Sequence, residues 1–212
     1  MLANTVSRWY NVRKLCDGGT GMKLFLIRHG QTTANDKKIY VGQTDVPLTQ
    51  QGREQAMAIR PILEKFTFDK VYSSDLQRAI DTQKLALPFD NPIRTPLLRE
   101  IDVGTAAGMA YGEPFVNQPE EYRRQGDYSI FGGENREMAC LRIRKFLDEL
   151  ECDPCENVAA FAHNGILSCM LRIVLDAPIK SGAAYSPNCA IHVFEFTNGM
   201  WKLKAWNYMI DL

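Results

Sequence analysis

Short apolar runs alternate with amphipathic segments of ten or more residues along this chain of 212 residues. Residues 23–28 (KLFLIR), 70–73 and 157–162 have the length and composition of buried strands. A segment with helical periodicity follows each of them. Strands and helices that alternate in this way form a mostly parallel sheet with helices packed on both faces. The sequence therefore predicts a single α/β domain.

Helices are expected at 51–66, 75–85, 134–150 and 165–175. Thr49 is placed to cap the first helix, and Asp75 lies in the first turn of the second, where a carboxylate is favoured by the helix dipole. Apolar residues at helical spacing predict two buried faces: Ala56, Ile59, Leu63 and Phe66 on the first helix, and Ala139, Ile143, Phe146 and Leu150 on the third.

The ends of the chain and the proline-containing stretch are expected to differ from this pattern. Residues 88–96 contain three prolines and predict a loop, whereas 189–196 and 201–206 predict a hairpin around Asn198-Gly199. Residues 1–21 are basic but lack the apolar core of a secretory signal. We therefore expect 1–21 to be an N-terminal extension and 22–212 to be the domain.

Charge and cysteine content exclude some classes of protein. Lys plus Arg equals Asp plus Glu at 25 each, and without a basic excess we expect no nucleic-acid partner. No apolar run reaches the roughly 18 residues of a membrane span, so we expect no membrane partner. Six cysteines without a disulfide pattern suggest a reducing compartment, which predicts a cytoplasmic protein. Cys152 and Cys155 form an isolated CxxC, interpreted as surface-turn thiols, with zinc binding or redox chemistry as the alternative.

The segments richest in chemistry follow the strands, at 28–35, 73–78 and 163–166. In α/β sheets, ligands bind beyond these carboxyl ends. His29 offers a nitrogen nucleophile near neutral pH, and the guanidinium of Arg28 matches phosphate oxygens. Such a pair suits phosphoryl transfer. The alternative is a histidine held by a backbone carbonyl beside an arginine in a surface ion pair.

Several motifs, in this order, resemble those of the histidine phosphatase (phosphoglycerate mutase-like) superfamily. They are LIRHGQTTAN (26–35), GQTDVPLTQQGREQA (42–56), SSDLQRAIDT (73–82), LLREIDVGTAAG (97–108), GGEN (132–135) and FAHNGI (161–166). The compact segment expected to cap the site and the GGEN motif resemble most the broad-specificity and α-ribazole-phosphate phosphatases of the superfamily. The resemblance implies a phosphoglycerate mutase-like fold.

The resemblance also implies a role for each matching residue. His29 would be the phosphorylated nucleophile, and Glu100 would be the general acid and then the base. The residues expected around the phosphate are Arg28, Arg78, His163 and Asn35, with the Asn164–Gly165 backbone assisting. Asn164 stands where the family often has glycine. His192, outside every motif, is expected to be structural.

The implied function is a metal-independent phosphatase that hydrolyses a small phosphorylated metabolite through a phosphohistidine, with no cofactor. A phosphoglycerate mutase-type phosphotransfer and a non-catalytic phospho-ligand binding module are the alternatives. Hydrolysis is favoured over mutase chemistry because the segment expected to cap the site, 105–133, is not strongly positive: it contains Arg123 and Arg124 but also Glu113, Glu120, Glu121 and Asp127. The sequence leaves a homodimer open and does not identify the substrate.

Overall fold

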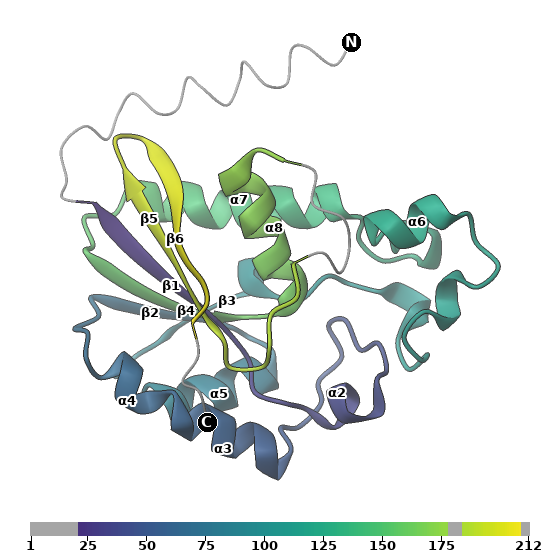
Figure 1. The fold of residues 1–212 in the computed structure, drawn as a ribbon, viewed down its shortest axis with the longest axis horizontal. Helices are drawn as coiled ribbons and strands as arrows, with labels where there is room; N and C mark the ends of the chain where they lie inside the picture. The colour runs from purple at the N-terminus through teal and green to yellow at the C-terminus, as the bar shows by residue number, and fades with distance from the viewer. Residues whose placement is uncertain (1–20, 178–183, 209–212) are drawn as a thin grey trace.

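The sheet has six strands in the order β3-β2-β4-β1-β5-β6 (Figure 1). The computed structural model describes residues 21–177 and 184–208. The strands are β1 (Met22–Arg28), β2 (Lys70–Ser74), β3 (Ile93–Thr95), β4 (Asn157–Ala162), β5 (Ile191–Thr197) and β6 (Met200–Tyr208). The first four run parallel, and β5 and β6 are antiparallel to their neighbours. The predicted mostly parallel sheet is confirmed.

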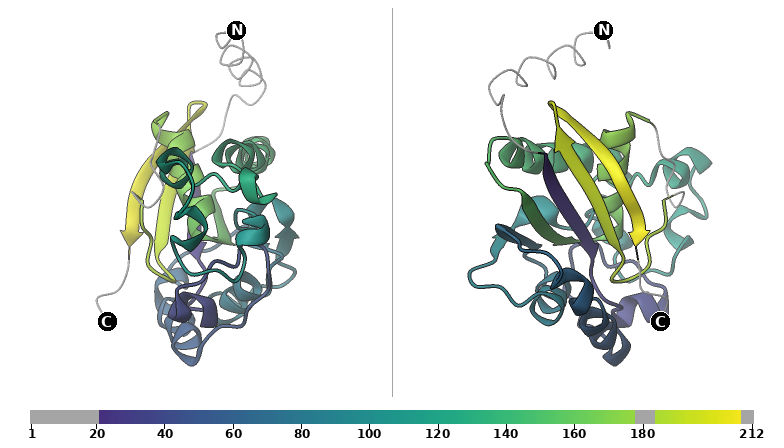
Figure 2. Two further views of the ribbon diagram at one scale, coloured as in Figure 1. Left: turned by 90° about the vertical axis from the view of Figure 1, so that its right-hand side faces the viewer. Right: turned by 60° about the vertical axis from the view of Figure 1, so that its left-hand side comes forward.

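Helices cover both faces of this sheet. They are α2 (Thr33–Lys37), α3 (Gln50–Ala58), α4 (Arg60–Leu63), α5 (Gln77–Ala86), α6 (Glu120–Gln125), α7 (Arg136–Glu151) and α8 (Asn164–Leu175). Figures 1 and 2 show α7 and α8 on one face and α3, α4 and α5 on the other.

Alternate residues of β1 supply the two resulting cores. Leu24 and Leu26 pack with residues of α7 and α8, whereas Phe25 and Ile27 pack with residues of α3 to α5. All four side chains are buried. A strand that is buried on both faces lies inside the sheet, and the first motif lies at the carboxyl end of this strand.

Most expected helices form where their caps and periodicity predict. The Thr49 hydroxyl accepts a hydrogen bond from Gly52 N at 3.0 Å, and Asn135 caps α7 by accepting from Met138 N at 2.9 Å. The four apolar residues predicted for one face of α7 are buried. The expected hairpin forms between β5 and β6, with Asn198 and Gly199 at positive φ in its turn.

The helix expected at 51–66 is wrong as a single element. Pro61 has no N–H to donate to the preceding turn, so α3 ends at Ala58 and α4 starts a new turn. Phe66, expected on the buried face, is 40% exposed because it lies beyond the end of α4. The other three residues of the expected face are buried.

Two further expectations need correction. Helix α5 begins at Gln77 rather than at Asp75, because the backbone of Leu76 is extended; the Asp75 carboxylate lies before the first turn and pairs with the guanidinium of Arg99 at 2.7 Å. The stretch expected to be a loop contains β3, which pairs with β2 between two prolines. Edge strands tolerate prolines at their ends.

Other expectations concern the chain ends, membranes and the CxxC pair. Residues 1–20 of the expected extension lie outside the described residues. In the described part of the chain, no helix has the length and apolar character needed to span a bilayer.

Cys152 is exposed at the end of α7, whereas the buried Cys155 thiol donates to the Asp153 carboxylate. Burial and this hydrogen bond raise the pKa of Cys155 to about 11, so its thiol stays protonated near neutral pH.

Candidate active site

The register of two parallel strands brings the two motif histidines together. Arg28 of β1 pairs with Ala162 of β4, so the next residue on each strand, His29 and His163, lie side by side. Their ring centroids are 5.1 Å apart. Both rings are buried. The sheet itself therefore sets the spacing of the pair.

His29 is held in one orientation by backbone contacts. Its Nδ1 donates to the Gly30 carbonyl at 2.8 Å, which leaves the lone pair on Nε2. Burial holds the pKa of His29 well below its ordinary value, and the guanidiniums of Arg78 and Arg28 lower it further. A neutral imidazole with a free Nε2 lone pair is a competent nucleophile.

Arg78 and His163 form the second part of the site. The Arg78 Nε donates to the His163 Nδ1 at 3.2 Å, and its terminal nitrogens donate to the carbonyls of Thr44 and Gly42. Since the His163 Nδ1 accepts, its Nε2–H donates to the Ser74 hydroxyl at 2.9 Å. Burial, followed by the charge of Arg78, holds the pKa of His163 well below its ordinary value.

Arg28 contributes a second buried guanidinium. It donates to the Ser186 carbonyl and lies 5.9 Å from the centroid of the Tyr185 ring. Its Nε is buried and has no hydrogen-bond partner among the described residues. A buried cation that bonds only to neutral groups and keeps one donor unused is suited to an anion.

Glu100 approaches the same edge from the loop after β3. Its carboxylate accepts from Ile101 N at 2.8 Å and from Gly165 N at 3.2 Å. A Cβ on Gly165 would overlap the carboxylate, so glycine is required for this approach. The Gly165 N–H, expected to assist a phosphate, is thus engaged by Glu100. Arg99 pairs with Asp75, whereas the Glu100 carboxylate lies at the start of α8, two residues from His163 along the chain through its bond to Gly165 N.

The two asparagines named from the sequence organise backbone segments around the site. The Asn35 Oδ1 accepts from Thr32 N at 3.1 Å and closes a capping box on α2. The Asn164 Oδ1 accepts from Ser186 N at 3.2 Å and so links α8 to the segment that contacts Arg28. Their contact with a phosphate stays a prediction.

Sequence reasoning missed three side chains that support the histidines. Asn188 donates to the His29 carbonyl at 2.9 Å, Thr82 accepts from Gly30 N at 2.9 Å, and Ser74 bonds His163. Ser74 and Thr82 lie within the SSDLQRAIDT motif, which pointed to this region. Asn188 lies in no motif, and no signal in the sequence marks it.

Among residues 21–177 and 184–208, no group of three or more His, Cys, Asp or Glu side chains is arranged to hold a metal ion. Arg28 and Arg78 place positive charge next to the histidines.

Known proteins resemble this chain in sequence and in fold. Residues 24–209 match the sequence model of the histidine phosphatase superfamily (branch 1). The adenosylcobalamin/α-ribazole phosphatase of Salmonella typhimurium is 30% identical over 76% of this chain and 83% of its own. The metal-independent phosphoserine phosphatase of Arabidopsis thaliana is 30% identical over 87% of this chain and 81% of its own. A phosphoglycerate mutase structure from Bacillus anthracis, 22% identical, shares the fold with a TM-score of 0.77 over 89% of this chain and 94% of its own.

Proposed function

We propose that this chain, a phosphatase that belongs to the histidine phosphatase superfamily, hydrolyses a small phosphomonoester through a phosphohistidine at His29. The observation that carries the proposal is the neutral His29 ring, held by the Gly30 carbonyl with its Nε2 lone pair free, beside two buried guanidiniums. No metal takes part, since Arg28 and Arg78 supply the positive charge.

The first step transfers the phosphoryl group to the enzyme. The Nε2 of His29 attacks phosphorus while the bond from phosphorus to the alcohol oxygen breaks. The protonated Glu100 carboxyl gives its proton to the departing oxygen, so the product leaves as a neutral alcohol. Arg28 and Arg78 stabilise the charge on the phosphoryl oxygens, and His163 joins them by turning its Nε2–H from the Ser74 hydroxyl to a phosphoryl oxygen.

The second step returns the enzyme to its starting state. Glu100, now a carboxylate, takes a proton from a water molecule whose oxygen attacks the phosphorus of the phosphohistidine. The bond from phosphorus to Nε2 breaks, inorganic phosphate leaves, and Glu100 is again protonated. Each step transfers one proton through the same carboxylate.

Hydrolysis, rather than mutase chemistry, is the proposed main activity. A mutase must retain a doubly phosphorylated intermediate, which requires positive charge in the cap at 105–133. In the cap, Arg123 pairs with Glu120 at 3.4 Å, and α6 begins with two glutamates, so little charge remains for a second phosphate. The substrates in the names of these relatives differ from one another, so the substrate is proposed only as a small phosphomonoester.

The test replaces His29 and traps the intermediate. His29→Ala and His29→Asn are expected to lower turnover of p-nitrophenyl phosphate by at least about 10³-fold while circular dichroism stays unchanged. Acid-labile, base-stable phosphate should appear on the unaltered protein and on neither variant. Near-normal turnover by both variants would reject the proposal.

Two additions to this test separate the finer claims. EDTA is expected to leave activity unchanged, and a loss reversed by zinc or magnesium would contradict metal independence and direct attention to Cys152 and Cys155. With 3-phosphoglycerate and a 2,3-bisphosphoglycerate primer, release of free phosphate is expected to exceed formation of 2-phosphoglycerate. The reverse ratio would favour a mutase.

A further inference from the structure

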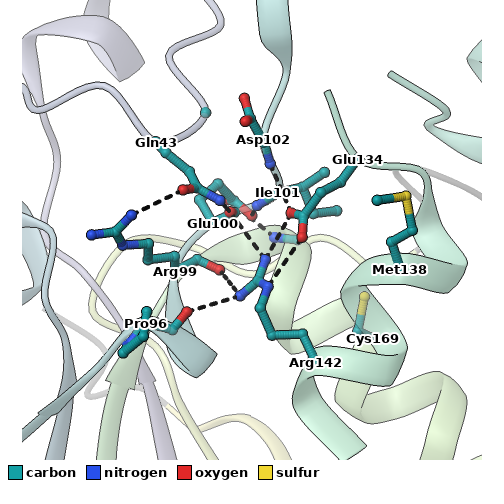
Figure 3. A network of polar contacts seen from close by, with 12 residues as sticks. Gln43, Pro96, Arg99, Glu100, Ile101, Asp102, Glu134, Met138, Arg142 and Cys169 are labelled. Atoms are coloured by element: carbon teal, nitrogen blue, oxygen red, sulfur yellow. Dashed lines mark hydrogen bonds and ion pairs between the residues drawn. The ribbon is translucent and has the colours of Figure 1, made fainter. Parts of the chain in front are cut away.

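The loop that carries Glu100 is held by one arginine of α7 (Figure 3). The terminal nitrogens of Arg142 donate to four backbone carbonyls of the loop, with the shortest bond, 2.7 Å, to the Arg99 carbonyl. The others reach the carbonyls of Leu97 at 3.0 Å, Glu100 at 3.3 Å and Pro96 at 3.4 Å. A single planar guanidinium thus fixes the chain on the N-terminal side of the general acid.

Glu134 holds the same loop on the other side of Glu100. Its carboxylate accepts two hydrogen bonds from the Arg142 guanidinium, at 2.8 and 3.1 Å, and a third from Asp102 N at 2.9 Å. The Glu134 backbone N–H donates to the Asp102 carbonyl at 2.8 Å. Both side chains of the ion pair are only 16% exposed, so water competes little for these bonds.

Gly133 of GGEN and Gly104 of the opposite segment allow this contact. A Cβ on Gly133 would overlap the Asp102 carbonyl, and a Cβ on Gly104 would overlap the Phe131 carbonyl. The two backbone segments therefore pack directly against each other. This close approach brings Glu134, the third residue of GGEN, within reach of the loop, and it accounts for a motif to which the proposed mechanism assigns no chemistry.

The direction of the Glu100 carboxylate depends on backbone position. Its hydrogen bonds are to its own neighbour, Ile101 N, and to Gly165 N at the start of α8. A small displacement of the loop would lengthen the second bond and move the acid away from the leaving group. A misplacement of about 1 Å can cost about 100-fold in rate.

We propose that Glu134 and Arg142 are positioning residues that hold the loop Pro96–Asp102 so that Glu100 can protonate the leaving alcohol. The proposal rests on the proposed function, because it assumes that Glu100 is the general acid. The pair touches no reacting atom and acts through the backbone on both sides of Glu100.

The experiment compares leaving groups. An alkyl phosphate needs its oxygen protonated in the transition state, whereas p-nitrophenolate leaves with little help. The kcat/KM ratio isolates the steps up to alcohol release. Arg142→Met is expected to lower kcat/KM by about 10- to 100-fold for glycerol 2-phosphate and by less than about 3-fold for p-nitrophenyl phosphate, in the same sense as Glu100→Gln.

Arg144 offers a matched control on the same helix. Its guanidinium is similarly buried, at 12% exposure, and pairs with Asp148 and Glu151 away from the loop. Arg144→Met removes an equivalent ion pair and is expected to change kcat/KM by less than about 2-fold for both substrates. Arg142→Lys and Glu134→Gln keep most of the packing. Both are expected to show the leaving-group effect even if Arg142→Met folds poorly, because neither retains the whole set of bonds.

A double variant tests that the pair acts through Glu100. In a Glu100→Gln background, Arg142→Met should cost less than about 3-fold more with glycerol 2-phosphate, because the proton donor is already absent. Equal losses on both substrates for the Arg142 and Glu134 variants, with discrimination retained by Glu100→Gln, would overturn the positioning role and leave the proposed function intact. If Glu100→Gln itself fails to discriminate, its assignment as the acid fails and the positioning role fails with it. Trapped phosphohistidine on His29 reports separately on the nucleophile.

Discussion

The two motif histidines are held in opposite tautomers by different partners. His29 uses its Nδ1–H on the Gly30 carbonyl, whereas His163 accepts at Nδ1 from Arg78 and donates from Nε2 to Ser74. Neutral rings that lie 5.1 Å apart do not repel each other, and the depressed pKa of each keeps them neutral. Neighbouring residues of one type can therefore serve different purposes.

At the same scale, Gly165→Ala should separate activity from stability. The added Cβ would overlap the Glu100 carboxylate and the end of the Ile101 side chain, both of which can move, while alanine favours the helix. We expect kcat/KM for glycerol 2-phosphate to fall about 10-fold or more, with a change of less than about 1 kcal/mol in the free energy of unfolding. Activity and urea unfolding measure the two effects. Ser168→Ala, one turn further along α8, is the control, and unchanged activity of Gly165→Ala would refute the tight approach.

Among the elements, α3 has a direct structural link to the nucleophile. A Cβ on Gly30 would overlap the Gly52 carbonyl, and one on Gly52 would overlap the Gln31 carbonyl, so the helix and the nucleophile's loop meet backbone to backbone. Thr49 N also donates to the Gln31 carbonyl at 2.9 Å. Helix α3 thus fixes the loop that presents His29, although it supplies no chemical group.

Gly52→Ala measures this contact. Alanine would stabilise an ordinary helix by about 1 kcal/mol, but here the neighbour is rigid backbone. The cost of overpacking should exceed the gain in helix propensity and lower the free energy of unfolding by about 1–3 kcal/mol. Activity should also fall, because the loop after His29 shifts. Gln51→Ala, exposed on the same turn, should stay within about 0.5 kcal/mol. A stabilised Gly52→Ala protein would show that the contact relaxes freely.

Whether a feature could be predicted from the sequence depends on how far apart along the chain the interacting residues lie. Strand β1 and helix α7 were predictable because periodicity and caps are local properties, and His29 and His163 because they lie in short motifs. The break at Pro61 was visible but outweighed by the apolar spacing on either side of it.

Other features depend on contacts between distant segments and leave no local pattern. Arg142 bonds carbonyls more than forty positions away, and any residue type presents the same carbonyl. Asn188 reaches the His29 carbonyl in the same way. Strand β3 forms because β2 offers an edge, and three residues between prolines are too short to signal it.

Over the whole molecule, all three histidines are buried, and burial lowers the pKa of each. The pKa of His192 falls to about 3, and those of His29 and His163 lie well below their ordinary value. The folded chain therefore binds fewer protons than the unfolded chain once the pH falls below about 6.5. The stability that these residues provide is complete above that pH and is lost progressively below it.

This linkage predicts a steep acid dependence of stability. Three histidines that protonate only on unfolding give a slope that approaches about 4 kcal/mol per pH unit near pH 5.5. Urea unfolding between pH 7.5 and 5.5 in phosphate-free buffer measures it, above the range in which most carboxylates titrate. His192→Gln should reduce the slope by about one third. A stability independent of pH across this window would contradict neutral burial.

The two buried guanidiniums have a consequence for the empty protein. Arg28 and Arg78 bond to carbonyls and a neutral ring, and they lie close enough to each other for the charge of Arg28 to lower the pKa of Arg78. The fold thus confines like charges that a bound anion would relieve, so phosphate acts as a missing counterion of the native state. Inorganic phosphate at about 100 times its Kd should add about 2.7 kcal/mol to the free energy of unfolding. Chloride at equal ionic strength should add far less, and Arg78→Met should lose most of the phosphate effect. An equal response to both salts would mean general screening.

The product of the reaction is therefore also a ligand that stabilises the folded state. Slow release of phosphate follows from the same charges that promote its transfer.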